Sequence, residues 1–326
     1  DTDTTNVVGT ELVTNGTFAS DVSGWSAITS TLSVVSNALQ IEQTSGTGWA
    51  YQGITTVVGK TYTLSFDVKQ GTTLNYRVYV GTTAGDSSLY YSGTLSAGAS
   101  FATISATFTA TSTTTVLQFG PWASSTDTIF FDNISVKLAE EDRSVNNNGL
   151  QVNGTITKTA VATGADLVAY SGFSASNYLE QPYNADLDFG TGDFSVSFWA
   201  KRPAASGSTT VILSKSPSGL ITPPYFEFQP ASTMRWVGNN SSSRLISTTV
   251  FGTSWMFVVM TRISNVGSLY INGNLEASAT NNDNYNHSNT DTVRVGLRQD
   301  GWLGSADQEC ALLRISATAP TAAQIK

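Results

Sequence analysis

Short runs in which apolar and polar residues alternate recur along most of the chain. In one of them, Tyr62, Leu64, Phe66 and Val68 are each separated by a single polar residue. A two-residue period is typical of a strand that is buried on one face only. Such runs are separated by Gly, Asn, Ser and Thr turns, and no segment of residues 9–138 has a helical period. The pattern predicts an all-β chain built from antiparallel sandwiches.

Two Asn-Gly dipeptides lie between alternating runs. Asn272-Gly273 separates "GSLYI" from "NLEAS", and Asn153-Gly154 lies inside "GLQVNGTITKTA". Asn-Gly favours the two-residue turn of a β-hairpin, because both positions tolerate a positive φ. We therefore expect a hairpin at each dipeptide. Because an isolated hairpin is marginally stable, the apolar residues around Asn153-Gly154 should be buried against another surface.

The length of 326 residues is enough for two domains with separate cores. The patterns predict a first β-sandwich at 1–138, a linker with a β-hairpin at 139–160, and a second sandwich at 161–326. The final "SATAPTAAQIK" has the features of a helix start, with Thr318 as N-cap and Pro320 in the first turn. We expect the second sandwich to be truncated there, and the chain to come from a longer parent.

Composition excludes several classes of partner. The 24 acidic and 16 basic residues give a net charge of -8, and no Lys/Arg cluster occurs, so we expect no nucleic-acid binding. The longest apolar run is "WMFVVM" at 255–260, too short for a membrane helix, so we expect no membrane insertion. Cys310 is the single cysteine, and its apolar surroundings predict a buried thiol.

Candidate catalytic groups are sparse. His287 is the single histidine and lies in an Asn-rich stretch with no nucleophile motif, which argues against a catalytic triad. Asp186, Asp188 and Asp193 surround a Gly-rich turn, and turn chemistry explains them better than catalysis. We therefore expect a protein that is not an enzyme and has no organic cofactor.

The first 130 or so residues contain an ordered set of motifs. They are "ELVTNGTF…GW", "GKTYTLSFDVK", "ATFTATSTTTVLQFG" and "IFFDNISVKL". In this order they resemble the galactose-binding-like β-jelly rolls of carbohydrate-binding modules, close to the family 4/9 group. The resemblance implies a β-sandwich with a glycan groove across one sheet. It also implies a structural calcium held by oxygen ligands, for which the matching positions are Thr17, Asn37 and Asp132.

Modules of this kind stack aromatic rings on the apolar faces of sugars and bond hydroxyl groups with amide side chains. The resemblance places Tyr90 or Tyr91 and Gln118 in the groove. Further candidates on neighbouring stretches are Trp49, Tyr51, Arg77, Tyr79 and Trp122. Ordinary packing is the competing explanation for each aromatic residue.

The second half contains "YLEQPYNADLDFGTGDFSVSFWAK", "LYINGN" and "VRVG…GWLGSADQ". This set resembles LamG-like, concanavalin A-type jelly rolls, a group that implies recognition, adhesion or scaffolding. One branch of that architecture hydrolyses glycans with acidic residues at alternate positions of one strand, a pattern this sequence lacks.

The charged "EDRS" followed by "GLQVNGT" and the second sandwich resembles structural proteins of bacteriophages. That resemblance implies a location on the virion surface, as a capsid decoration, fibre or tail appendage. The partners would be other virion proteins, further copies of the chain, and a polysaccharide or cell-surface glycan. The alternative is a glycan-binding accessory region of a secreted bacterial glycanase or adhesin. A purely structural role without glycan binding also remains open.

Overall fold

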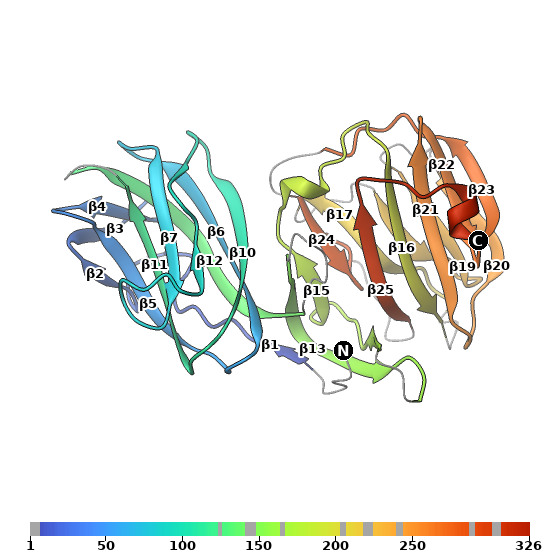
Figure 1. Ribbon diagram of the computed structural model, residues 1–326, viewed down its shortest axis with the longest axis horizontal. Helices are drawn as coiled ribbons and strands as arrows, with labels where there is room; N and C mark the ends of the chain where they lie inside the picture. The colour runs from blue at the N-terminus through green and yellow to red at the C-terminus, as the bar shows by residue number, and fades with distance from the viewer. Residues whose placement is uncertain are drawn as a thin grey trace. The chain divides into compact units, whose positions relative to one another are not determined.

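The computed structural model describes residues 7–122, 126–140, 148–163, 167–202, 207–217, 224–238, 244–286, 291–301 and 308–326. It divides into an N-terminal unit, Gly9–Gln151, and a C-terminal unit that includes Val152–Lys326. The division falls inside the stretch 139–160 that the sequence suggested as a linker. Both units consist of antiparallel strands (Figure 1), so the predicted all-β sandwich class is confirmed.

The N-terminal unit is a sandwich of two sheets, which we call the inner sheet and the outer sheet. In the inner sheet the strand order is β3 (Ser30–Val35), β4 (Ala38–Gln43), β12 (Thr128–Glu140), β6 (Thr61–Gln70) and β10 (Ala102–Thr109). In the outer sheet it is β2 (Ser26–Ile28), β5 (Trp49–Thr55), β11 (Thr114–Pro121), β7 (Asn75–Gly81) and β8 (Tyr90–Tyr91), with β9 (Leu95–Ser96) also pairing with β7. Of the short strand β1 (Val7–Gly9), Val7 and Val8 belong to the C-terminal unit.

Aromatic side chains join the two sheets of this unit. Phe119 of β11 lies 5.4 Å from Phe66 of β6 and 5.1 Å from Phe131 of β12, measured between ring centroids. All three rings are completely buried. Tyr62, Leu64, Phe66 and Val68 are buried as their spacing predicted. The period-two pattern therefore identified the core face of β6 correctly.

The C-terminal unit is a second sandwich. One sheet has the order β15 (Tyr178–Gln181), β24 (Asp291–Val295), β17 (Thr210–Pro217), β18 (Tyr225–Phe228), β19 (Thr233–Val237) and β20 (Arg244–Val250). The other has β13 (Leu150–Ala160), β14 (Val168–Ser171), β25 (Glu309–Ser316), β16 (Phe194–Lys201), β21 (Met256–Ile263), β22 (Val266–Ile271) and β23 (Asn274–Thr280). Phe198 of β16 packs edge-on against Phe226 of β18, 5.3 Å away, and so connects the sheets.

The hairpin predicted at Asn272-Gly273 is confirmed. Ile271 pairs with Asn274, and φ is 49° at Asn272 and 80° at Gly273. Two successive positive φ values are the signature of a type I′ turn, whose twist matches that of the flanking strands.

The hairpin predicted at Asn153-Gly154 is wrong. These residues lie within the continuous strand β13, which begins beside β12, with Gln151 opposite Ala139, and later pairs with β14. Gly154 does adopt a positive φ, and a β-carbon there would lie 2.1 Å from the Asn177 side-chain oxygen. The glycine therefore permits a close approach of another segment rather than a turn. Val152 and Ile156 are completely buried, as expected for an ordered segment.

The C-terminal helix begins later than predicted. Thr321, not Thr318, is the N-cap of α1 (Ala322–Ile325), and its side chain forms a capping box with Gln324. Pro320 therefore precedes the helix. Within the described part of the chain, no helix has the length and apolarity needed to cross a membrane. Cys310 is buried, as predicted.

Replacement of Phe119 by alanine should destabilise the N-terminal unit by about 3–5 kcal/mol, because it removes the ring that connects both sheets and leaves a cavity. Scanning calorimetry of the whole chain should show that the melting transition of the N-terminal unit moves to lower temperature. Thr114→Ala, an exposed position on the same strand, should change stability by no more than about 0.5 kcal/mol. Equal effects of the two variants would contradict this account of the core.

Candidate functional site

Alternation along β7 and β11 separates core residues from surface residues in the outer sheet. Val78 and Val80 point into the core, where neither is accessible to solvent. Arg77 and Tyr79 therefore point to the opposite face of the sheet. Gln118 of β11 lies opposite both Tyr79 of β7 and Tyr51 of β5. The structure thus brings Tyr51, Arg77, Tyr79 and Gln118 to one face, as the sequence suggested.

Trp49 lies at the base of this face. Its ring centroid is 4.5 Å from that of Tyr79, and only 6% of the residue is exposed. A β-carbon at Gly120 would lie 3.0 Å from the Trp49 ring and 2.1 Å from the Gly48 carbonyl oxygen. The absence of a side chain at Gly120 therefore lets the indole lie close against β11. Trp49 supports Tyr79 and offers little surface of its own to a ligand.

Two other aromatic residues are much more accessible. Tyr91 is 49% exposed and Trp122 is 38% exposed. The Arg77 guanidinium carbon lies 3.0 Å from the Trp122 ring centroid and 5.7 Å from that of Tyr91. Tyr79 meets Tyr91 edge-on at 5.1 Å. We call Trp49, Tyr51, Arg77, Tyr79, Tyr91 and Trp122 the outer aromatic face.

A hollow adjoins the outer aromatic face at Trp122. Gln43, Gly46 and Thr47 line it together with Trp122, and its volume is about 310 Å³. Its lining is mixed polar and apolar, which suits a molecule that has both kinds of surface.

Gln118 does not have the role that the resemblance implied. It is completely buried, and its side-chain oxygen accepts a hydrogen bond from the Gly85 N–H. Its amide nitrogen donates to the Asp86 carbonyl oxygen at 2.9 Å. Both ends of the amide are therefore used to hold the loop 82–89 against the sheet. Gln118 positions this loop and is covered by it.

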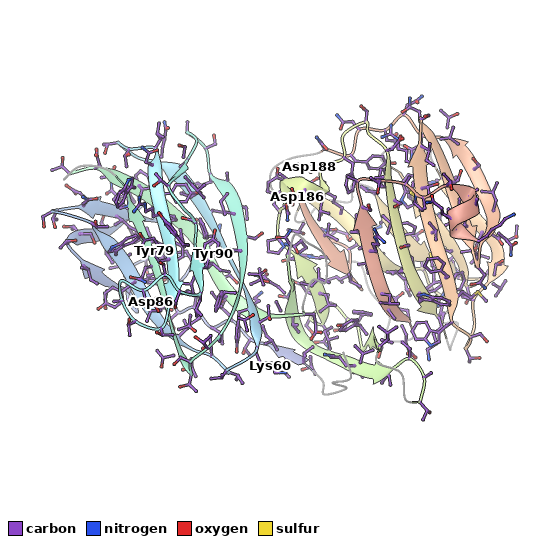
Figure 2. The ribbon with its side chains drawn as sticks, in the orientation of Figure 1. Lys60, Tyr79, Asp86, Tyr90, Asp186 and Asp188 are labelled. Atoms are coloured by element: carbon purple, nitrogen blue, oxygen red, sulfur yellow. The ribbon has the colours of Figure 1, made fainter. Side chains whose placement is uncertain are left out.

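Asp86 closes the same loop (Figure 2). Its carboxylate accepts hydrogen bonds from the Thr82 N–H at 2.7 Å and from the Ser88 hydroxyl and N–H, both at 2.8 Å. These bonds, that of the Thr82 N–H first, lower the pKa of Asp86 to about 2. A β-carbon at Gly81 would lie 2.5 Å from the Asp86 side chain. The run "GTTAGDSS" carries a turn signal in its Gly, Asp and Ser residues, but nothing local in it predicts that the loop covers Gln118.

Tyr90 lies on the wrong side of its strand to belong to the face. It pairs with Val80, whose side chain is in the core, and it packs against the buried cluster of the unit. Burial raises the pKa of its phenol. Of the two adjacent tyrosines that the sequence left open, Tyr91 is the surface residue, and Tyr90 is partly buried against the core.

The three calcium candidates lie on segments that the fold brings together. The Ile134 N–H donates to the Gly16 carbonyl oxygen at 2.9 Å, which brings the segment of Thr17 to that of Asp132. Asn37 lies in the turn just before β4, where Leu39 pairs with Phe131. Thr17 and Asn37 are both exposed. Asn37 has a φ of 60°, so turn formation is a competing reason for its presence.

Asp132 lies opposite a second carboxylate. Its partner in the strand register is Asp67 of β6. Burial raises the pKa of Asp132. The hydrogen bond from the Asn133 N–H lowers this pKa, whereas the negative charge of Asp67 raises it further. Among the described residues, no three His, Cys, Asp or Glu side chains gather closely enough to hold a metal ion. A calcium ion here would need hydroxyl, amide and main-chain oxygens as well, and the residues present offer them.

The three aspartates singled out from the sequence, Asp186, Asp188 and Asp193, have separate roles. Figure 2 labels Asp186 and Asp188. Asp186 lies in a short 3₁₀ turn, Ala185–Leu187, that Asn184 caps. Asp193 accepts a hydrogen bond from the Ser264 N–H at 2.9 Å. Turn chemistry therefore accounts for Asp186, whereas Asp193 connects two segments that are distant in sequence.

Asp188 belongs to an ion-pair cluster that the sequence did not reveal. Lys215 lies 2.9 Å from Asp188 and 3.4 Å from Asp291. Tyr183 donates its hydroxyl proton to Asp188 at 2.9 Å. Lys215 and Asp291 are buried. Loss of any one charge of the cluster would therefore leave a buried charge without its partner, which is strongly destabilising. His287 lies outside the described residues.

Acid should leave the loop 82–89 in place until the pH approaches 2. The native pKa of Asp86 is depressed, so its stabilising effect is complete above the pKa of an unfolded aspartate and is lost as the pH falls through about 2. Carbon-13 NMR titration of the Asp86 carboxyl carbon in the folded chain should give a midpoint near 2. A midpoint near 4, the usual aspartate value, would show that the hydrogen bonds from Thr82 and Ser88 do not persist in solution.

Several solved structures are similar to parts of the chain. One described as "CBM4 structure and function" is 22% identical, and the match covers 38% of this chain and 98% of that chain with a TM-score of 0.34. The N-terminal CBM22-1-CBM22-2 tandem domain from Paenibacillus barcinonensis Xyn10C is 12% identical, with coverages of 95% and 98% and a TM-score of 0.34. The botulinum neurotoxin serotype D binding domain is 18% identical, with coverages of 58% and 47% and a TM-score of 0.44.

The match thus spans less than half of the botulinum chain. All three TM-scores lie below 0.5, so none of these similarities bears on function. The curated proteins contain no match to the chain. The family model Laminin_G_3, described as the concanavalin A-like lectin/glucanases superfamily, matches residues 173–326. The C-terminal unit therefore contains a region similar to concanavalin A-like lectins and glucanases.

Proposed function

We propose that this protein binds glycans without cleaving them, and that the outer aromatic face is its binding site. One observation carries the proposal. Two accessible rings, Tyr91 and Trp122, lie near the Arg77 guanidinium on the surface of one sheet. Both rings are exposed, and Trp122 also lines the hollow.

The chemistry of the face suits a sugar. The C–H groups of a pyranose ring form an apolar surface that packs on an aromatic ring, while its hydroxyl groups need hydrogen-bond partners at the edge. Arg77 and the hydroxyl groups of Tyr51, Tyr79 and Tyr91 supply such partners. A supported, largely preformed site of this kind loses little conformational entropy on binding.

The C-terminal unit supports recognition rather than hydrolysis. Its matching family includes lectins as well as glucanases. Hydrolysis of a glycosidic bond requires two suitably spaced carboxyl groups that act on the substrate. In the described residues of this unit, Glu180 pairs with Arg294 and Glu227 pairs with Arg235, and Asp188 and Asp291 share Lys215. These carboxylates are engaged in structural ion pairs.

For the biological setting we propose the surface of a bacteriophage particle. There the chain would decorate the head, a fibre or the tail, and would contact other virion proteins and further copies of itself. The motifs from "EDRS" to the second sandwich support this setting. An accessory region of a secreted bacterial glycanase or adhesin is supported equally well by the lectin and glucanase match, and a catalytic domain elsewhere in the parent polypeptide would favour it.

Replacement of Tyr91 and Trp122 by alanine should weaken glycan binding about tenfold or more, because these rings provide the accessible stacking surface. Binding should be measured on a glycan array and then by calorimetry with the best ligand. Trp199→Ala is the matched control. Trp199 is 37% exposed and stacks at 5.3 Å on Phe257 in the C-terminal unit, so its loss should leave the affinity within about twofold.

Unchanged binding by the Tyr91/Trp122 double variant would show that glycans do not bind at the outer aromatic face. Release of reducing ends from any array glycan by the wild-type chain would contradict the non-catalytic assignment.

We further propose a structural calcium bound near Thr17, Asn37 and Asp132. A cation there would offset the repulsion between Asp132 and Asp67, which lie opposite each other in the strand register. Hydroxyl, amide and carboxylate oxygens are the ligands that calcium prefers. The ion would join the start of the unit to β12 and the β3–β4 turn.

Chelation should therefore lower the melting temperature of the wild-type chain by about 2–5 °C, because the ion binds the native state only. Asp132→Asn should melt at the same temperature with and without chelator. Asp186→Asn, at an exposed position of the C-terminal unit, should respond as the wild type does. A wild-type melting temperature that does not change with chelator would exclude a tightly held ion.

A further inference from the structure

Arg77 has hydrogen-bonding capacity that the protein does not use. Its Nε donates to the Thr94 hydroxyl at 2.9 Å, and its Nη1 makes a long contact of 3.4 Å with the Tyr79 hydroxyl. Among the described residues, Nη2 has no hydrogen-bond partner and no carboxylate pairs with the guanidinium. The group is half-buried and stacked on Trp122. Because Arg77 points to the outer aromatic face, this N–H group is available to a ligand there.

The other described strand arginines that are buried or half-buried are used differently. Arg235 pairs with Glu227 and Arg294 pairs with Glu180. The buried Arg262 donates to the main-chain oxygens of Asn281 and Gly192, both at 2.9 Å. Arg77 differs from these three in having neither an acidic partner nor a main-chain acceptor among the described residues. The surroundings of Arg77 hold its planar guanidinium in one orientation but place no carboxylate beside it.

We propose that the outer aromatic face recognises glycans that carry a carboxylate, with Arg77 binding the carboxylate of a uronate residue. This inference rests on the proposed glycan-binding function and specifies its substrate class. A guanidinium binds a carboxylate through two parallel N–H···O bonds, and the fixed fork gives this pair its geometric specificity. Trp122 and Tyr91 then pack against the sugar ring that carries the carboxylate or against its neighbour.

The net charge of -8 does not oppose this assignment at physiological salt. The Debye length is about 8 Å at 0.15 M ionic strength, so the distant carboxylates of the chain are screened. A charge-assisted pair on a partly desolvated aromatic surface is screened much less. Recognition therefore depends on the local arrangement at Arg77 and not on the overall charge.

The test compares ligands that differ only in charge. Wild-type protein is titrated at 0.15 M salt with polygalacturonate, with its fully methyl-esterified form, with neutral xylan and β-glucan, and with a sulfated galactan. The expected result is binding to polygalacturonate at least about tenfold tighter than to its methyl ester. This comparison needs no variant, so misfolding cannot affect it.

Arg77→Gln should then weaken polygalacturonate binding roughly 10- to 100-fold and weaken the binding of neutral glycans by a smaller factor, because only the uronate loses a charge-assisted pair. Arg77→Lys keeps the charge without the planar fork and should lose an intermediate amount. Lys69→Gln is the matched control. Lys69 lies 4.8 Å from the Phe101 ring and 4.9 Å from the Phe130 ring, on the other sheet of the same unit, so its loss removes the same charge far from the site. It should bind as the wild type does.

Each other outcome overturns the inference. Equal binding of polygalacturonate and its ester, or equal losses in Arg77→Gln and Lys69→Gln, would exclude a uronate contact at Arg77. Tighter binding of the sulfated galactan than of polygalacturonate would show that the face recognises a sulfate ester and not a carboxylate. Binding to neutral glycans alone would reject the uronate inference and leave the proposed function intact, whereas no binding to any glycan would reject both.

Discussion

Strict alternation along β7 and β11 is the constraint on which the candidate site depends. Val78 and Phe119 must point inward, because Phe119 joins the two sheets through Phe66 and Phe131. Arg77 and Tyr79 consequently point outward in fixed positions. A shift of one residue in either strand would reverse both faces at once. The core of the unit and the outer aromatic face are therefore two results of the same strand register.

Much of this arrangement could be predicted from the sequence. The spacing of Tyr62 to Val68 identified a core strand, and Asn272-Gly273 identified a hairpin, because both signals are local and depend on backbone preferences. Six of the eight glycan candidates named from the sequence lie together as the outer aromatic face, and their role in binding stays a prediction. Strand positions with the same parity share a face, so periodicity is enough to collect them once the strands are known.

The errors come from contacts between distant segments. Gln118 has the parity of a surface residue, yet the loop around Asp86 covers it. Gly154 has the local features of a turn, but the approach of Asn177 explains its positive φ better. Tyr90 and Tyr91 differ only in parity, and "LYYSG" is too short to show which one faces the core. Local sequence does not contain the tertiary contacts that decide such cases.

The central claim is that glycans bind to the outer aromatic face of the N-terminal unit. The most direct test is a crystal structure of the whole chain with a bound oligosaccharide chosen from the strongest array ligand. The account predicts sugar rings against Tyr91 and Trp122, within hydrogen-bond distance of Arg77. An oligosaccharide bound on the opposite sheet, along β6 and β10, or on the C-terminal unit alone would contradict it.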